Sequence, residues 1–150
     1  MGLFDKLKGA MNAVTGGCAK VTIEYQPQVG LPGDYVRVRV TATSTGAAIN
    51  SKGVYVDLLA QEAIHLKGGD HDGVHHNETT FNQEVQIAPA FQLAAGQALQ
   101  WEGQFQLPPT AQPSYVGRHA KHEWFIRGRI EAFGNDPDSG WQPFRVGARP

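Results

Sequence analysis

Two runs of alternating residues between Ala98 and Phe133 constrain the fold of this 150-residue chain more than any other feature. Apolar or small residues fall at every second position, at Trp101, Gly103, Phe105 and Leu107 and again at Trp124, Ile126, Gly128 and Ile130. Period-two alternation is typical of a β-strand with one buried face. We therefore expect two strands joined by a long proline-bearing loop. Their bulky side chains should lie at the centre of the hydrophobic core, with Trp101, Phe105, Trp124, Ile126 and Ile130 as its main members.

The same alternation recurs along the rest of the chain. It predicts strands at 19–25, 35–43, 53–64 and 141–146. Within 79–93, where Pro89 interrupts the pattern, it predicts either two strand pieces or an edge strand with a bulge. The run LLAQEA within 53–64 also has helical propensity, but its β-branched start favours a strand. The polar, histidine-rich residues 65–77 are expected to form a loop. Seven or eight short strands separated by turns predict an all-β fold, an antiparallel, immunoglobulin-like β-sandwich.

The N-terminal residues have a different periodicity. Leu3, Phe4, Leu7 and Met11 recur at helical spacing opposite charged and polar residues, and two glycines follow. This pattern predicts a short amphipathic helix and linker over 1–17, ahead of a sandwich domain over 18–150. A helix of this length is marginal alone in water, so its apolar face needs a partner. Three partners for this apolar face remain open: the sandwich itself, a second copy in a homodimer, or a membrane surface.

Charge and composition exclude several classes of function. The formal net charge is −1, which gives no general attraction to nucleic acid. The single cysteine, Cys18, excludes an internal disulfide and is compatible with the reducing cytoplasm, where we expect the protein. No apolar run approaches the roughly 20 residues that span a bilayer, and no signal peptide is recognisable. Serine elbows, phosphate loops and dinucleotide fingerprints are also missing, so we expect neither a cofactor nor an enzymatic activity.

One polar segment has the character of a metal site. Asp70, His71, Asp72, His75 and His76 combine imidazole and carboxylate groups, which suit zinc or a similar ion. The glycines around them favour a mobile loop, which would lose conformational entropy on forming a site. Two interpretations stay open: an ordinary exposed loop, or a metal-binding site with or without a metal-dependent activity.

Two more histidines precede the second alternating run. His122 shares the expected inward face of Trp124 and should be partly buried at the start of a strand, whereas His119 lies in the loop before it. A joint role with the first histidine cluster requires that the fold bring the two groups together. Further along, Asp136 and Asp138 indicate a turn whose side chains accept backbone hydrogen bonds, because the spacing lacks the other ligands of a calcium loop.

Four arginines occupy outward positions of two expected strands: Arg37, Arg39, Arg127 and Arg129. A solvated sheet face explains such an alternation. If both strands instead share one face, the four guanidinium groups form a basic surface that suits phosphate or an acidic peptide.

The order of these features resembles the arrestin-like superfamily, and within it the bacterial sporulation-control branch. Four stretches carry the resemblance: the turn 31–36 (LPGDYV), the strand end 107–109 (LPP), the segment 113–117 (PSYVG) before the strand 124–130 (WFIRGRI), and the acidic turn 135–138 (NDPD). The resemblance implies an arrestin-like sandwich with a scaffolding or regulatory role and no catalysis. Members usually have two sandwiches in tandem, whereas this chain has room for one, so self-association into a homodimer is an expectation.

These observations lead to one main functional expectation. The protein is expected to be a non-enzymatic interaction module with a regulatory or scaffold role and a protein partner that the sequence leaves unidentified. The pattern is compatible with two modes of partner binding: a strand added at a sheet edge, or the N-terminal helix docked in a groove. The alternatives are a metal-binding function at residues 70–76 and an adaptor that contacts membranes through residues 3–14.

Overall fold

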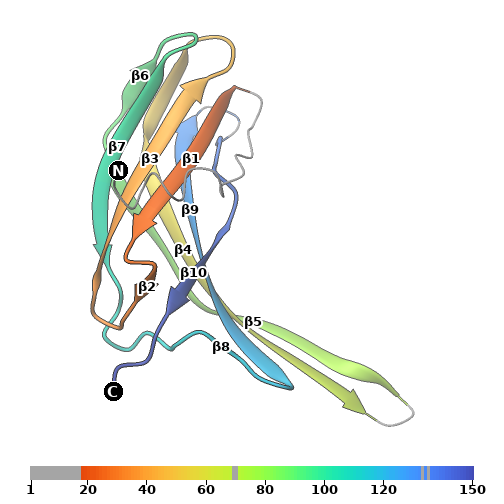
Figure 1. Ribbon diagram of the computed structural model, residues 1–150. Helices are drawn as coiled ribbons and strands as arrows, with labels where there is room; N and C mark the ends of the chain where they lie inside the picture. Colours follow the sequence, from red (N-terminus) through yellow and green to blue (C-terminus); the bar gives the residue numbers. More distant parts are fainter. Residues whose placement is uncertain (1–17, 69–70, 133, 135) are drawn as a thin grey trace.

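The computed structural model describes residues 18–68, 71–132, 134 and 136–150. These residues form strands and turns without a helix (Figure 1). The strands are β1 (Ala19–Gln26), β2 (Val29–Gly30), β3 (Tyr35–Ser44), β4 (Ile49–Gly68), β5 (His71–Ala88), β6 (Phe91–Leu93), β7 (Ala98–Gln106), β8 (Tyr115–Val116), β9 (Ala120–Ala132) and β10 (Gln142–Val146). In this part of the chain nothing is helical, long and apolar enough to cross a membrane. The predicted helix, with Leu3, Phe4, Leu7 and Met11, lies outside the described residues, and its suggested contacts stay predictions.

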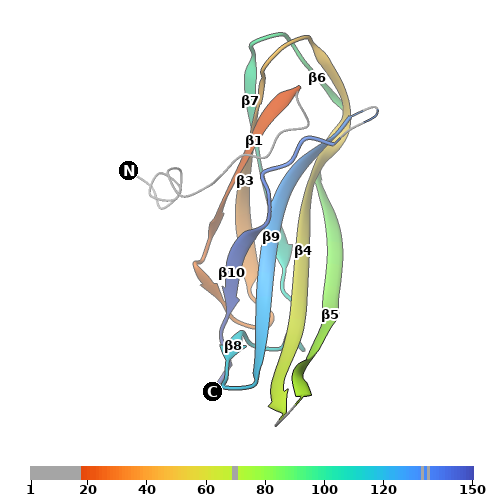
Figure 2. The same cartoon turned by 90° about the vertical axis from the view of Figure 1, so that its right-hand side faces the viewer.

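Two sheets pack face to face, which confirms the predicted all-β sandwich. The smaller sheet has the order β1-β3-β7, and the larger has β2-β10-β9-β4-β5, with β6 on β4 and β8 on β9. All pairings are antiparallel except that of β2 with β10. Figure 2 shows the two layers from the side. The strands β9, β4 and β5 continue beyond the smaller sheet, and the end of the β4–β5 hairpin projects from the body in Figure 1.

The core lies between the inner faces of the two sheets and has the composition that the alternation predicted. Val36, Val38 and Val40 of β3 face Val54, Val56 and Leu58 of β4 and Ile126 and Ile130 of β9, and all eight are at most 1% exposed. Trp124 is also buried, at 2% exposure, and its indole Nε1–H donates to the carbonyl oxygen of Gln112 at 2.8 Å. Phe105 is buried as well. The burial of Phe105 and of the inward positions of the second run is therefore correctly predicted.

The prediction for Trp101 needs a correction. β7 is the edge strand of the smaller sheet, and β9 is an inner strand of the larger one, so the two runs belong to different layers. Trp101 is only half-buried and packs against Phe91 with ring centroids 4.4 Å apart. An edge position leaves one side of the Trp101 ring without a neighbouring strand, so the ring lies at the margin of the core and stays partly exposed.

The expected loop at 65–77 is also wrong. β4 runs on to Gly68, and β5 begins at His71, so these residues belong to one long hairpin. The register pairs Ile64 with His76 and His65 with His75. Apart from Leu66 and Val74 the segment carries no large apolar residue, so it shows no hydrophobic alternation. Strand pairing here overrides the weak local propensity.

Gly128 marks a close approach of the two sheets. A Cβ atom added at this position would lie 3.0 Å from Cγ2 of Val40 and 3.3 Å from Cβ of Ile23, both in the smaller sheet. Glycine weakens a strand, but it fits this position because any side chain would push the two layers apart. Its backbone N–H donates to Oγ of Ser139 at 3.0 Å, which holds the 136–140 turn against β9.

We predict that Gly128→Val lowers the free energy of unfolding by about 1–3 kcal/mol, because the added methyl groups overpack the contact with Val40 and Ile23. Urea denaturation measures the change. Gly46→Val is the matched control, since a Cβ atom at that glycine meets nothing within 4 Å. Equal stability of Gly128→Val and wild type would contradict this account of the sheet contact.

Candidate functional site

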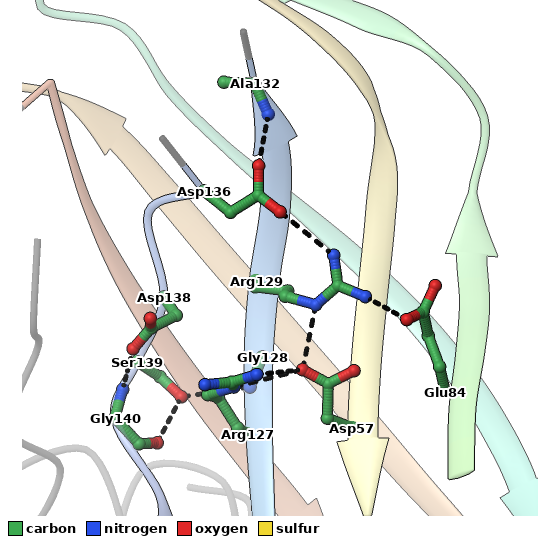
Figure 3. Close-up of polar contacts among 10 residues, drawn as sticks. All are labelled: Asp57, Glu84, Arg127, Gly128, Arg129, Ala132, Asp136, Asp138, Ser139 and Gly140. Carbon is green, nitrogen blue, oxygen red and sulfur yellow. Dashed lines mark hydrogen bonds and ion pairs between the residues drawn. The ribbon is translucent and has the colours of Figure 1, made fainter. Parts of the chain in front are cut away.

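A polar network on the outer face of the larger sheet is the most elaborate constellation in the described chain (Figure 3). Its centre is Arg129 of β9, which is 9% exposed. The guanidinium group bonds three carboxylates: Nε to Asp57 at 2.9 Å, Nη2 to Glu84 at 2.5 Å and Nη1 to Asp136 at 3.4 Å. Each carboxylate comes from a different part of the chain, so this one side chain connects β4, β5 and the 136–140 turn.

Arg127 completes the network from the same strand. Its Nε and Nη2 donate to Oδ2 of Asp57 at 3.0 and 2.8 Å, the same oxygen that accepts from Arg129. The Arg127 Cζ atom also lies 4.3 Å from the ring centroid of Trp141, within the range of a cation–π contact. Arg129 makes a similar contact with Tyr55, at 4.6 Å.

Strand register explains why these groups meet. Asp57 lies opposite Arg127 in β9 and opposite Glu84 in β5, so acid and base form a row across three strands. Facing side chains in antiparallel strands lie about 5 Å apart, close enough for an ion pair. The sequence shows the outward positions of the arginines but does not show which acids the register places beside them.

The network shifts the pKa of its central group. Burial by itself lowers the pKa of Arg129, but hydrogen bonding and charge interaction with Asp57, and then Glu84, outweigh it, so the pKa is raised above its ordinary value. Burial raises the pKa of Tyr55, and a hydrogen bond to Glu131 raises it further. Both shifts favour the forms present at neutral pH, a charged arginine and a neutral phenol.

A hollow of about 740 Å³ lies over this network. Five carboxylates line it, together with Arg127 and Arg129, so the surface has an excess of negative charge; the five are Asp57, Glu84, Glu131, Asp136 and Asp138. Leu59 and Trp141 add apolar surface. The composition suits a basic ligand group better than an anion.

The predicted basic surface therefore does not form. Arg37 and Arg39 belong to β3 of the smaller sheet, and Arg127 and Arg129 belong to β9 of the larger one, so the four do not share a face. Arg39 pairs with Glu102 at 3.0 Å. Acidic partners thus neutralise Arg39, Arg127 and Arg129 locally.

The turn at 136–140 has the predicted form. Oδ1 of Asp136 accepts a hydrogen bond from the backbone N–H of Ala132 at 3.1 Å, and Oδ1 of Asp138 accepts one from Gly140 at 2.7 Å. These are side chain-to-backbone bonds that stabilise a turn. The additional bond of Asp136 to Arg129 is a role that the sequence did not reveal.

His122 is buried, as predicted from its shared face with Trp124. Its Nδ1 lies 2.9 Å from the carbonyl oxygen of Pro113, which only an N–H can satisfy, so Nε2 accepts from the hydroxyl of Thr80 at 2.7 Å. The ring is 1% exposed and both nitrogens have partners. His122 therefore connects the loop before β8 to β5, and its role is structural.

Of the predicted metal ligands, the structure describes the side chains of His75 and His76, and it places them on opposite faces of β5. Asp70 lies outside the described residues, and for His71 and Asp72 only the backbone is described. His75 faces His65 across the hairpin, whereas His76 points to the other face and lies 3.8 Å from Glu78. Within the described chain, no group of three or more metal-ligating side chains is gathered around one point.

The free edge of β5 lies beside the hollow. β5 is the last strand of the larger sheet, and in the described chain its only backbone partner is β4. Asn82 and Glu84 of β5 line both the edge and the hollow. The open backbone groups of β5 and the acidic hollow therefore lie next to each other on the surface.

Comparison with solved structures identifies the architecture. The chain superposes on the crystal structure of Spo0M, a sporulation control protein from Bacillus subtilis, with a TM-score of 0.66 and 21% sequence identity. The fold is that of Spo0M. The likeness covers 89% of this chain and 51% of Spo0M, so the chain spans about half the length of that protein. The sandwich fold that the resemblance implied is thus shared with Spo0M. Comparisons with protein-family models and with curated proteins give no match.

We predict that Asp57→Asn destabilises the protein strongly, because it leaves two largely buried guanidinium groups without their shared carboxylate. The expected loss in the free energy of unfolding is about 3 kcal/mol, as measured by urea denaturation. Glu102→Gln is the control, since it removes the exposed ion pair with Arg39 and should change stability by less than about 1 kcal/mol. Similar losses in the two variants would contradict a special role for the network.

Proposed function

We propose that this protein is a non-enzymatic regulatory or scaffold module that binds an extended segment of a partner protein along the free edge of β5. The observation that carries the proposal is the length of this edge. β5 has 18 residues, His71–Ala88, compared with eight in β1 and nine in β7, the edge strands of the smaller sheet. An open edge supplies backbone N–H and C=O groups to one more strand.

The direction of the backbone bonds identifies the groups that a partner strand would use. The N–H of His65 donates to the carbonyl oxygen of His119, so odd-numbered residues of β4 turn their backbone groups toward β9. Leu59 is one of these residues, and it pairs with Asn82 of β5. The N–H and C=O of Asn82 are therefore directed away from β4, toward the open edge.

The chemistry of the adjacent hollow favours a basic partner segment. A strand added beside β5 would place every second side chain on the outer face, next to Asn82 and Glu84. The side chain of Glu84 is 57% exposed and the hollow has an excess of carboxylates. Lysine or arginine at the alternate positions of the partner would complement this charge.

The likeness to Spo0M supports the regulatory part of the proposal, because Spo0M is a sporulation control protein. Since the chain spans about half of Spo0M, a second copy is one candidate partner. Light scattering at micromolar concentration tests this arrangement, with an expected mass near twice that of the 16.3 kDa chain. A monomeric mass throughout that range would contradict the homodimer but not binding of another protein at β5.

We predict that Asn82→Pro abolishes partner capture. Proline removes the N–H that faces the open edge, and it is tolerated on an edge strand because the ladder to β4 does not use that N–H. The immobilised full-length variant should lose the proteins that wild type captures from a lysate of the native cell, as compared by mass spectrometry.

Asn82→Ala is the matched control, because it changes the same side chain but keeps the N–H. It should capture the wild-type set, and circular dichroism should show that both variants retain the β-sheet spectrum. If Asn82→Pro is folded and captures the same proteins as wild type, the edge of β5 is not the binding site.

A further inference from the structure

Two histidine rings are in contact near the end of the β4–β5 hairpin, and the backbone of a third histidine is bonded to the backbone of one of these two residues. The Nδ1 atoms of His65 and His75 are 2.8 Å apart, and their ring centroids are 4.1 Å apart. The backbone of His119, just before β9, is bonded to His65 on the other side, with the N–H of His65 2.8 Å from the carbonyl oxygen of His119. All three residues are exposed.

The register explains the close contact of the first two rings. Because His65 directs its backbone groups toward β9, it forms a non-hydrogen-bonded pair with His75 across β4 and β5. In such pairs the Cα atoms are only about 4.5 Å apart, and the side chains are closer than at any other position of a hairpin. Two imidazoles are thus held together by the sheet itself.

We propose that His65 and His75 form a binding site for a divalent transition-metal ion of the zinc type, with His119 as a third ligand and water completing the shell. Neutral imidazole is the preferred nitrogen ligand of such ions. His65 is new to the candidate set, whereas His119 was considered in the sequence only for a joint role with the cluster at residues 70–76. The site lies on the same hairpin as the proposed partner edge, but it uses side chains of the hairpin end and not the backbone groups of β5 at Asn82.

The geometry requires little change to accept an ion. With Zn–N bonds of about 2.0–2.1 Å, two nitrogens at a tetrahedral angle lie about 3.4 Å apart. The Nδ1 atoms of His65 and His75 need to separate by only about 0.6 Å, which small rotations of exposed rings supply. His119 needs a rotamer that turns its ring toward this pair, and its exposed position permits that change.

Other histidines of the hairpin region provide internal controls. His76 lies near Glu78, on the face of β5 opposite to His75. The two neighbouring histidines therefore cannot bind the same ion. His122 is buried and uses both ring nitrogens for hydrogen bonds to Thr80 and Pro113. The proposed site therefore makes different predictions for neighbouring histidines of the same chain.

Titration of the tag-free, full-length protein with zinc alone tests the proposal by calorimetry. We expect one saturable site per chain. His65→Ala and His75→Ala should each lower the affinity at least tenfold, because loss even of a group that supports a ligand weakens binding by about 10–100-fold. His76→Ala should bind zinc as wild type does. Circular dichroism of each variant checks that these exposed substitutions leave the fold intact.

Imidazole NMR resonances give a second readout. Zinc should shift the signals of His65, His75 and His119 and leave that of His122 unchanged. The absence of saturable binding, or an equal loss of affinity in His76→Ala, would overturn the site. Wild-type affinity in His119→Ala would overturn the assignment of the third ligand.

Discussion

The pairing of β4 with both β9 and β5 is the constraint on which the rest of the molecule depends. β4 has 20 residues and is bonded along most of its length on both sides. Between Val54 and Ala60, its even-numbered positions face the smaller sheet and build the core, whereas its odd-numbered positions lie on the outer face of the larger sheet. One alternation therefore sets the core, the row that joins Asp57 to the arginines, and the contact between His65 and His75. A slip of one residue would exchange the two faces and abolish all three together.

Sequence reasoning succeeded where one face of a strand is apolar and the other is polar. The inward positions of β3, β7 and β9 were predictable because burial of one face imposes a period of two. Where large apolar residues are nearly absent, as at residues 65–77, the same reasoning failed, since no alternation remains to be read. The positions of the arginines were also predictable, but their partners were not. The acids beside Arg129 come from residues 57, 84 and 136, and only the register of three strands brings them together.

The two faces of the larger sheet contribute to stability in different ways. On the inner face, Gly128 lets the sheets approach, and apolar burial contributes most of the stability. On the outer face, Arg129 is surrounded by carboxylates, and removal of one partner leaves a largely buried charge that is difficult to solvate. This arrangement holds β5 against β4 by a side-chain contact, from Glu84 to Arg129, in addition to the backbone ladder. The free edge is therefore rigid at Glu84, and a preorganised edge loses less entropy when a partner strand binds.

The end of the hairpin lacks this support. Beyond His65, β4 is paired with β5 alone, and a two-stranded ribbon is marginally stable in water. An ion held by His65 and His75 would connect the two strands at the level where pairing with β9 ends, and His119 would attach them to the third strand. Metal binding would therefore stabilise the projecting part of the hairpin without touching Asn82, where partner binding is proposed. Because the two sites use different residues of the same strand, the histidine variants should keep partner capture and Asn82→Pro should keep the zinc site.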